Sequence, residues 1–209
     1  MDTRTRAEEA LKRLKKEYPE RGPFVEWKNS LELVVGTMLS AQCTDVRVNM
    51  VTKTLFKKYK TAKDYARADL CTLEKEIYST GFFKSKAKYL KGIGERIVKD
   101  FGGRVPATLE DLLTLPGLSH KSAHLVMAKA FGKFTGIAVD THVYRVAPRL
   151  GLTQSKDRDK VAGDLEKLYP PKEYLNVNEY CIMHGRAICK PRPLCGECVL
   201  QDICPSADI

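Results

Sequence analysis

The sequence has 209 residues, enough for one large domain or for two modest domains with a sizeable core. Hydrophobic residues make up 43% of it, which argues against wholesale disorder, and no run of about 18 apolar residues predicts a transmembrane helix. Lys and Arg outnumber Asp and Glu by 36 to 26, and the resulting net charge of +10 suits a polyanionic partner such as nucleic acid. The charge suits a basic protein without such a partner equally well.

The start of the sequence has no recognisable targeting segment. Residues 3–11 mix both charge signs and lack an apolar stretch, so they do not predict a secretory signal peptide. We therefore expect the protein to stay inside the cell, in a reducing compartment. There the seven cysteines, of which four fall within residues 189–204, favour metal ligation over a disulfide framework.

Helical periodicity dominates the chain, and no stretch shows the alternation of a strand. The sequence therefore predicts an all-α protein built from short helices with short connections. The expected helices lie at residues 7–18, 31–39, 45–59, 62–68, 70–78, 84–101 and 119–131, then after Asp140 and at 156–168 and 172–184. The expected N-caps are Thr44, Asp69, Thr108 and Asp140, and the expected helix breaks are Pro19, Pro23 and Pro148.

The expected helix at 84–101 has two faces. Leu90, Ile97 and Phe101 supply an apolar face that points inward. Five lysines are expected on an exposed basic face: Lys84, Lys86, Lys88, Lys91 and Lys99. Just before this helix, Gly81 occupies the place of a left-handed stop.

The stretch from Leu115 to Ser119 predicts a tight turn that opens a helix. Glycine lets the backbone approach an anion closely, and the free amides of a helix N-terminus point at it, so the turn can seat a phosphate. Ser119 is a good N-cap, but it would be strained if its position required a positive φ. The alternative is an ordinary corner between two helices.

Lys121 lies in the first turn of the helix that follows, where the helix dipole opposes a cation. The dipole and any desolvation favour the free amine, which can attack a sugar C1′ and form a Schiff base. Such chemistry also needs a carboxylate to stabilise the cationic sugar or to move protons, and Asp140 can supply it. The alternative is a solvated surface lysine and a structural helix cap.

Four cysteines, Cys189, Cys195, Cys198 and Cys204, are separated by five, two and five residues. Thiolates at these positions can hold zinc or an iron–sulfur cluster. Structural zinc sites usually join two close couples of ligands, whereas this spacing contains a single close couple and suits a bulkier cluster. The other thiols are predicted to be small buried hydrophobes: Cys43, Cys71 and Cys181.

Together these motifs resemble one family. Residues 115–123, 139–142 and 184–186 and the four clustered cysteines occur in the order seen in endonuclease III, a helix-hairpin-helix DNA glycosylase. Residues 40–45 and 81–87 resemble it too, so the likeness covers nearly the whole chain. Two features depart from the family pattern. Ser119 stands where a second hairpin glycine is usual, and the loop between Cys189 and Cys195 is one residue shorter than usual.

The resemblance implies a two-domain enzyme of base excision repair. A six-helix barrel domain would span residues 23–133 and contain the hairpin, while residues 1–22 and 134–209 would form a domain around a [4Fe–4S] cluster held by the four cysteines. Lys121 would displace an oxidised pyrimidine from deoxyribose, with Asp140 as its carboxylate partner, and the resulting imine would drive strand cleavage by β-elimination. The cluster would act structurally. A monomer would act on double-stranded DNA that contains damaged bases or abasic sites.

The resemblance also implies DNA contacts. A stacked base must leave the duplex before excision, and the gap must be filled. Gln42 would enter the gap and Phe82 would wedge the opposite strand, where the family more often has leucine. The alternatives are an ordinary loop residue for Gln42 and a member of a small satellite core for Phe82. At the hairpin, Gly117, Ser119 and His120 would contact the DNA backbone. Independently of the resemblance, the charges of Lys190 and Arg192 on the cysteine loop suit contacts with DNA phosphates, and the alternative is that both are simply solvated.

Two other functions stay open from the sequence. One is a mismatch-directed glycosylase that removes uracil or thymine opposite guanine on the same scaffold. The other is a DNA-binding iron–sulfur module or redox sensor without glycosylase chemistry. Lys121 favours a lyase, because related glycosylases that lack this lysine stop at base removal.

Overall fold

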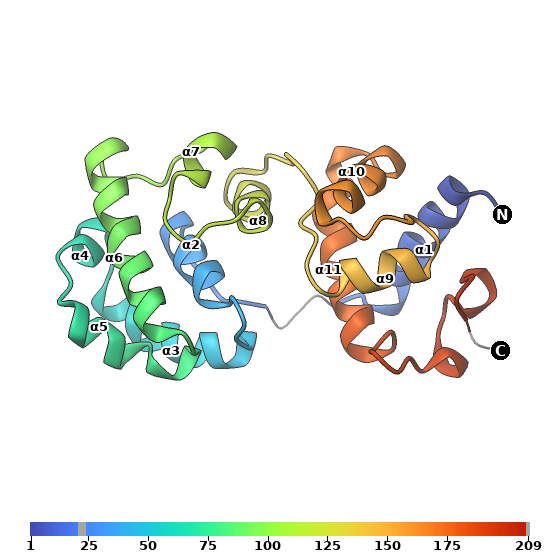
Figure 1. The fold of residues 1–209 in the computed structure, drawn as a ribbon, viewed down its shortest axis with the longest axis horizontal. Helices are drawn as coiled ribbons and strands as arrows, with labels where there is room; N and C mark the ends of the chain where they lie inside the picture. Colours follow the sequence, from blue (N-terminus) through green and yellow to red (C-terminus); the bar gives the residue numbers. More distant parts are fainter. Residues whose placement is uncertain (21–23, 208–209) are drawn as a thin grey trace. The chain divides into compact units, whose positions relative to one another are not determined.

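The computed structural model describes residues 1–20 and 24–207, and every regular element in these ranges is a helix (Figure 1). The predicted all-α fold is therefore confirmed. The α-helices are α1 (Thr3–Glu17), α2 (Ser30–Leu39), α3 (Asp45–Lys58), α4 (Ala62–Ala66), α5 (Leu70–Glu76), α6 (Phe83–Asp100), α7 (Leu109–Leu113), α8 (His120–Phe131), α9 (Val143–Arg149), α10 (Arg158–Leu168) and α11 (Tyr174–Ala187). The short 3₁₀ helices are η1 (Tyr78–Thr80), η2 (Pro171–Glu173), η3 (Cys195–Glu197) and η4 (Gln201–Ile203).

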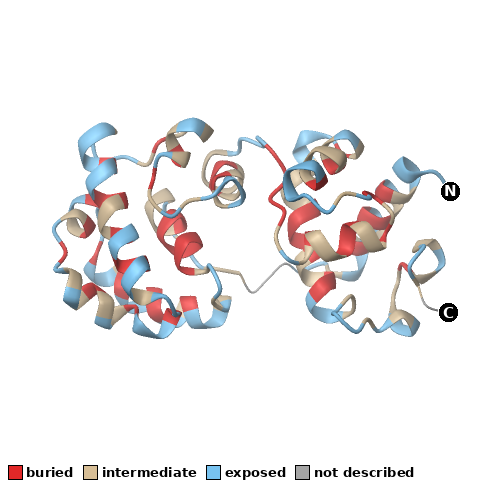
Figure 2. Ribbon diagram, in the orientation of Figure 1, coloured by how far each residue is buried: buried red, intermediate tan, exposed pale blue. Residues whose placement is uncertain are grey.

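The chain divides into two compact units. The hairpin unit comprises Pro23–Lys133, and the terminal unit comprises Met1–Gly22 together with Phe134–Ile209. Each unit buries a core of its own, formed by the helix faces drawn in red in Figure 2. Pro23, where the sequence predicts a break and a domain boundary, lies outside the described residues. A second predicted break, Pro19, directly follows Tyr18, the C-terminal capping residue of α1.

The hairpin unit is built around α2 and α6. Seven consecutive residues of α2 are buried, from Leu33 to Leu39, because α3, α6 and α8 all pack against this helix. Helix α4 comes unusually close to α6 at Gly94, where an added Cβ would lie 2.5 Å from the backbone nitrogen of Ala66. The apolar stripe predicted for α3 is buried as expected, and Thr44 caps that helix by accepting a hydrogen bond from the N–H of Arg47.

The terminal unit joins the two ends of the sequence. Helix α1 packs against α10 and α11, and its buried face consists of Ala7, Ala10, Leu11 and Leu14. The hydroxyl of Tyr169 donates a hydrogen bond of 3.0 Å to the carbonyl of Ala7, which fixes the start of the chain to its last third. Helix α9 is short and ends at Arg149, directly after Pro148, as the sequence predicts.

Two expectations about the start of α6 were wrong. Gly81 has a positive φ of 70° but a ψ of 156°, so it is not the left-handed helical stop; the left-handed residue is Phe82, with φ 49° and ψ 29°. Lys86 was predicted on the exposed basic face, yet it is buried at 4% exposure. It shares the inner face of α6 with Leu90, Ile93 and Ile97, which recur at the helical spacing of three and four residues.

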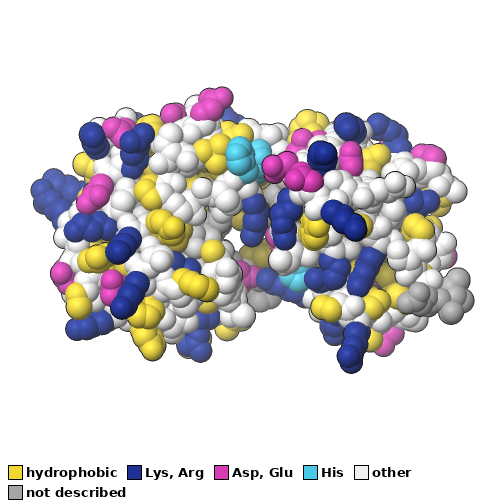
Figure 3. Space-filling model, in the orientation of Figure 1, with side chains coloured by type: hydrophobic (Ala, Val, Ile, Leu, Met, Phe, Trp, Pro, Cys, Tyr) yellow, Lys and Arg dark blue, Asp and Glu magenta, His cyan; other side chains and the backbone are white. Residues whose placement is uncertain are grey.

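Charge is spread over the surface of both units. Lys and Arg side chains dominate the charged positions on the face drawn in Figure 3, in keeping with the formal net charge of +10. Within the described ranges, no helix is long and apolar enough to cross a membrane.

Candidate active site and cysteine cluster

A tight hairpin joins α7 to α8. The N–H of Leu118 donates to the carbonyl of Leu115 across 3.2 Å, and Gly117 between them has a φ of +79°. Glycine is needed there for two reasons, because an L residue rarely adopts this φ and an added Cβ would lie 2.8 Å from the ring of Tyr89 on α6. The turn is therefore packed against α6, while Gly117 itself stays exposed.

Ser119 caps α8, as the sequence predicts. Its φ of −105° is extended, and its Oγ accepts a hydrogen bond of 3.4 Å from the N–H of Ser122. The strain that serine would suffer at a positive φ is therefore absent. The hairpin tolerates serine at this position because the positive φ falls on Gly117 instead.

Lys121 is the second residue of α8 and is exposed. In the described part of the chain, no hydrogen bond or ion pair engages its ammonium group. His120 beside it is exposed too, and its ring lies 6.3 Å from that of His124 one turn later. A lysine at the start of a helix with no competing partner is available to an incoming electrophile.

Asp140 is half-buried and fixed in orientation. Its Oδ1 accepts hydrogen bonds from the N–H groups of His142, at 2.9 Å, and Val143, at 2.8 Å. Among the described residues no hydrogen bond engages Oδ2. The sequence predicted Asp140 as the N-cap of the next helix, but α9 begins at Val143 with His142 as its N-cap. Asp140 thus caps the helix from two residues further upstream.

Three side chains hold the backbone that leads into Asp140. The N–H of residue 137 donates to Glu166 across 2.8 Å, Asn178 donates to the carbonyl of residue 138 across 2.6 Å, and Arg158 donates to the carbonyl of residue 139 across 3.1 Å. Sequence reasoning missed these three residues. They sit on α10 and α11, and no local pattern connects them to a segment some 20 to 40 residues earlier.

Gln42 and Phe82 share an uncommon backbone conformation. Their φ values are 53° and 49°, and in the described ranges they are the only residues other than glycine with a positive φ. Both side chains are exposed, and Phe82 shows 65% of its surface to solvent. Residues held in such sparsely populated conformations concentrate at functional sites. The sequence offered no signal of this strain, because neither residue type requires it.

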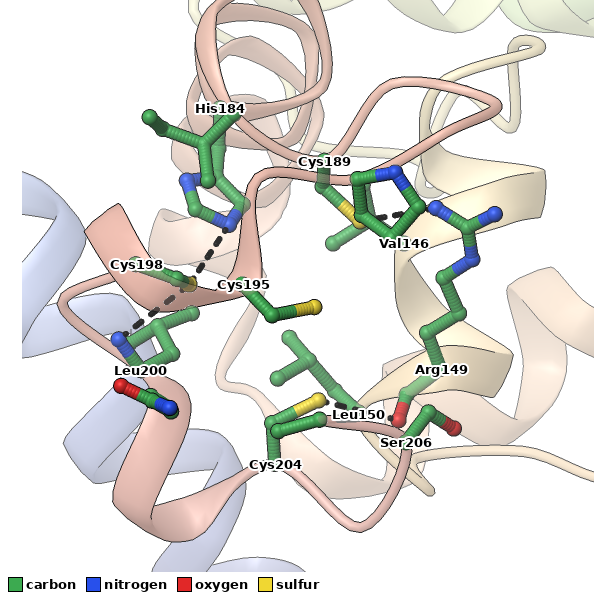
Figure 4. A pocket seen from close by; sticks show the side chains of 14 residues that line it. Val146, Arg149, Leu150, His184, Cys189, Cys195, Cys198, Leu200, Cys204 and Ser206 are labelled. Carbon is green, nitrogen blue, oxygen red and sulfur yellow. Dashed lines mark hydrogen bonds between the residues drawn. The ribbon is translucent and has the colours of Figure 1, made fainter. Parts of the chain in front are cut away.

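The four clustered cysteines line one pocket of the terminal unit, and their sulfurs face a common space (Figure 4). The pocket has a volume of about 30 Å³, which corresponds to about two or three water molecules at about 10–15 Å³ each. Among the described residues, no three His, Cys, Asp or Glu side chains lie close enough to share a single metal ion.

Hydrogen-bond donors surround these sulfurs. Arg149 Nη1 donates to Cys189 Sγ and the N–H of Leu200 donates to Cys198 Sγ, each across 3.4 Å. Burial raises the pKa of Cys198 and of Cys204, so both thiols need a nearby cationic centre to be held as thiolates. Such a donor set and such thiols suit an iron–sulfur cluster, whose sulfur ligands are deprotonated and hydrogen-bonded.

The short loop between Cys189 and Cys195 is shaped by α9. Arg149 donates to the carbonyls of Lys190, at 2.6 Å, and Pro191, at 3.0 Å, while Arg145 donates to the carbonyl of Cys189 at 2.8 Å. The two arginines lie one helical turn apart, so one face of α9 holds the loop. Lys190 and Arg192 are exposed on it. Sequence reasoning missed the role of both α9 arginines.

The remaining cysteines behave differently from one another. Cys181 is buried, as predicted, whereas Cys43 is half-buried. The prediction was wrong for Cys71, which is exposed in the first turn of α5. Leu73, two residues later, is the residue that this short helix turns inward.

Comparison with known proteins identifies the family. Residues 35–171 match the HhH-GPD superfamily of base excision DNA repair proteins. Endonuclease III of Synechocystis sp. is 48% identical over 203 residues, covering 97% of this chain and 93% of that protein. Endonuclease III of Bacillus subtilis is 43% identical over 178 residues, covering 84% of this chain and 81% of that protein. The chain belongs to the endonuclease III family.

The solved structures agree with this assignment. A non-covalent endonuclease III–DNA complex matches with a TM-score of 0.93 at 36% identity, covering 99% of this chain and 97% of that one. Members of the endonuclease III family are DNA glycosylases and abasic-site lyases of base excision repair, and this is the enzyme class of the chain. The family carries a [4Fe–4S] cluster.

Proposed function

We propose that the chain excises oxidised pyrimidines from double-stranded DNA through a Schiff base on Lys121 and then cleaves the strand by β-elimination. The observation that carries the proposal is the exposed amine at the start of α8, directly after the hairpin, with no competing partner in the described ranges. A solved endonuclease III that is 36% identical was trapped as a covalent intermediate with DNA. Such a bond needs a nucleophile of this kind.

The chemistry follows from the amine. The lone pair of Lys121 Nζ attacks C1′ of the deoxyribose, and the bond from C1′ to the base breaks with its electron pair on the base. The amine then loses a proton, and its electron pair expels the ring oxygen: the bond from C1′ to O4′ breaks, O4′ takes up a proton, and the product is a protonated imine between Nζ and C1′. Loss of a proton from C2′ then expels the 3′ phosphate. That step breaks the bond from C3′ to oxygen and cleaves the strand.

Asp140 is the proposed carboxylate partner. Oδ1 holds the turn through its two amide donors, so Oδ2 is the oxygen that would face the positive charge of the sugar or receive a proton. Because the hydrogen bonds to the backbone engage Oδ1 alone, Oδ2 can serve in either role. The network from Glu166, Asn178 and Arg158 keeps the backbone before Asp140 from moving as the charge develops.

DNA binding is proposed to use residues of both units. Gly117, Ser119 and His120 would seat a phosphate of the damaged strand at the hairpin, and the exposed cations Lys190 and Arg192 would hold phosphates elsewhere. Gln42 would fill the gap left by the flipped base, and Phe82 would stack against the opposite strand. We propose that a single copy of the chain binds the DNA.

We further propose that Cys189, Cys195, Cys198 and Cys204 hold a [4Fe–4S] cluster. The four sulfurs around one pocket, the N–H donors aimed at them and the cationic Arg149 support this assignment. When bound, the cluster would supply a rigid cross-link that keeps the loop of Lys190 and Arg192 in place. Purified protein should contain about four iron and four sulfide ions per chain. One zinc ion per chain in their place would refute the assignment.

Borohydride trapping on a duplex with one abasic site tests the Schiff base. The wild-type chain should become covalently attached to the DNA, and Lys121→Gln should abolish the adduct. Lys160→Gln is a matched control, because Lys160 is an exposed lysine in the first turn of α10. It should trap as the wild type does. A wild-type chain that fails to trap, or undiminished trapping by Lys121→Gln, would refute the proposal.

Excision assays separate oxidised pyrimidines from mismatches as substrates. Duplexes that carry thymine glycol should be processed faster than duplexes that carry a G·T or G·U pair. The reverse order would make the chain a mismatch-directed glycosylase on the same scaffold. Trapping on abasic DNA without excision from any of these duplexes would leave a lyase and remove the glycosylase half of the proposal.

A further inference from the structure

One buried ammonium group connects two turns of the hairpin unit. Lys86 Nζ donates hydrogen bonds to the carbonyl of Leu39, at 2.8 Å, and to the carbonyl of Thr80, at 2.7 Å. Leu39 is the last residue of α2, and Thr80 is the last residue of η1. Both carbonyls belong to helix ends, where unpaired oxygens accumulate and attract a cation.

The two carbonyls mark the points from which two strained turns depart. Gln42 follows Leu39 by three residues, and Phe82 follows Thr80 by two. These are the two residues other than glycine that have a positive φ in the described part of the chain. The single ammonium group of Lys86 thus holds the base of both turns, although they are about 40 residues apart in the sequence.

A lysine is a costly choice for this position. Its neighbours on the inner face of α6 are Leu90, Ile93 and Ile97, all fully buried. Burial lowers the pKa of Lys86, because desolvation penalises the charged ammonium, while the nearby Cys43 opposes the shift. An apolar residue would avoid this cost, so the bonds to the two carbonyls are the feature that requires a cation here.

We infer that Lys86 is a positioning residue, which fixes Gln42 and Phe82 relative to each other so that they enter DNA as one unit. The inference rests on the proposed function. Filling a gap in one strand and wedging the other requires two side chains at a set separation, since neighbouring bases are stacked at fixed spacing. A misplacement of about 1 Å in such an arrangement can cost about 100-fold in rate.

Two substrates separate positioning from chemistry. Excision from a duplex with a damaged pyrimidine needs both turns, whereas trapping on a single-stranded abasic oligonucleotide needs only Lys121. Lys86→Met should lower kcat/KM on the duplex by about tenfold or more and leave single-strand trapping within about twofold of wild type. Lys86→Arg keeps the charge and the donors and should recover part of the duplex activity. Lys88→Met is the matched control, because Lys88 is exposed on the same helix.

A cycle of variants shows whether Lys86 acts through the two turns. In a chain that already carries Gln42→Ala and Phe82→Ala, Lys86→Met should cost less than about twofold more on the duplex. An additional tenfold loss there, or equal losses on both substrates, would make Lys86 a general stabiliser and overturn the inference. If Lys86→Met does not fold, Lys86→Gln, which keeps an N–H donor, is taken through the same cycle. Failure of the wild type to trap single-stranded DNA would instead refute the proposed chemistry.

Discussion

Gly185 of α11 lies directly against the imidazole of His142, so that a Cβ at position 185 would be 2.6 Å from Nδ1. His142 in turn donates its backbone N–H to Asp140 and contacts Arg145 through Nδ1. The close approach of two helices at one glycine thus supports both the carboxylate turn and the arginine that holds the carbonyl of Cys189.

Replacing Gly185 by alanine should therefore destabilise the chain. The added methyl group collides with His142, and overpacking of this kind costs about 1–3 kcal/mol, against a gain of about 1 kcal/mol in helix propensity. Gly163→Ala is the matched control, because Gly163 also lies in a helix and nothing approaches its Cβ position within 4 Å. Thermal unfolding should show a lower Tm for the first variant and an equal or higher Tm for the second. Equal Tm changes in both would contradict the contact.

The hairpin glycine can be tested by a similar pair. Gly117 and Gly103 have nearly the same φ, +79° and +82°, but only Gly117 faces a neighbour, the ring of Tyr89. Alanine at either position should cost about 1 kcal/mol through the backbone, and Gly117→Ala should lose more because the ring must move. Duplex binding, measured by fluorescence anisotropy at one fixed salt concentration, should weaken for Gly117→Ala alone. Unchanged binding would show that the hairpin backbone does not seat a phosphate.

We expect Phe82 to lower the stability of the fold and to raise the rate of base excision. Glycine adopts the left-handed conformation of residue 82 without the cost of about 1 kcal/mol that an L side chain bears, and Phe82 is 65% exposed, so little burial is lost. Phe82→Gly should therefore unfold at the same or a higher denaturant concentration than wild type, while Phe82→Ala should not gain. Both should excise a damaged base from duplex DNA more slowly. A variant that loses the ring and keeps full duplex activity would show that Phe82 is not a wedge.

Arg149 should govern how firmly the cysteine loop keeps its cluster. Arg149→Ala removes the donor to Cys189 Sγ and both bonds to the loop carbonyls, so iron should be lost faster on exposure to a chelator. Visible absorbance followed over time gives the rate. Arg96→Ala is the control, because Arg96 forms a half-exposed ion pair with Asp100 on α6, in the other unit. A loss rate equal to that of the control would mean that the loop holds its shape without Arg149.

Much of the fold follows from the sequence because local signals carry it. The capping residues Thr44, Asp69, Thr108 and Ser119 all accept the backbone hydrogen bonds that their positions predict. The apolar stripe of α3 is buried as its spacing indicates. These features depend on neighbours within a turn or two, so the sequence is sufficient to predict them.

The features that could not be predicted from the sequence depend on contacts between residues far apart in the chain. The inward direction of Lys86 could have been found from its spacing to Leu90, but its two carbonyl partners could not, because they depend on how α2 and η1 end. The same holds for Asn178, which reaches a carbonyl 40 residues earlier. The left-handed backbone at Gln42 could not be predicted either, because glutamine does not require a positive φ.

The packing of α1 against α10 and α11 has a consequence for how the chain is made. The hydroxyl of Tyr169 donates a hydrogen bond to the carbonyl of Ala7, 162 residues earlier, so α1 cannot pack in its native position until most of the polypeptide has left the ribosome. Residues 23–133, by contrast, are contiguous and complete well before that moment, and can fold while synthesis continues. The apolar face of α1 therefore stays exposed to solvent until α10 and α11 have been synthesised. Slow translation of the last third of the sequence would lengthen the time for which this face is exposed.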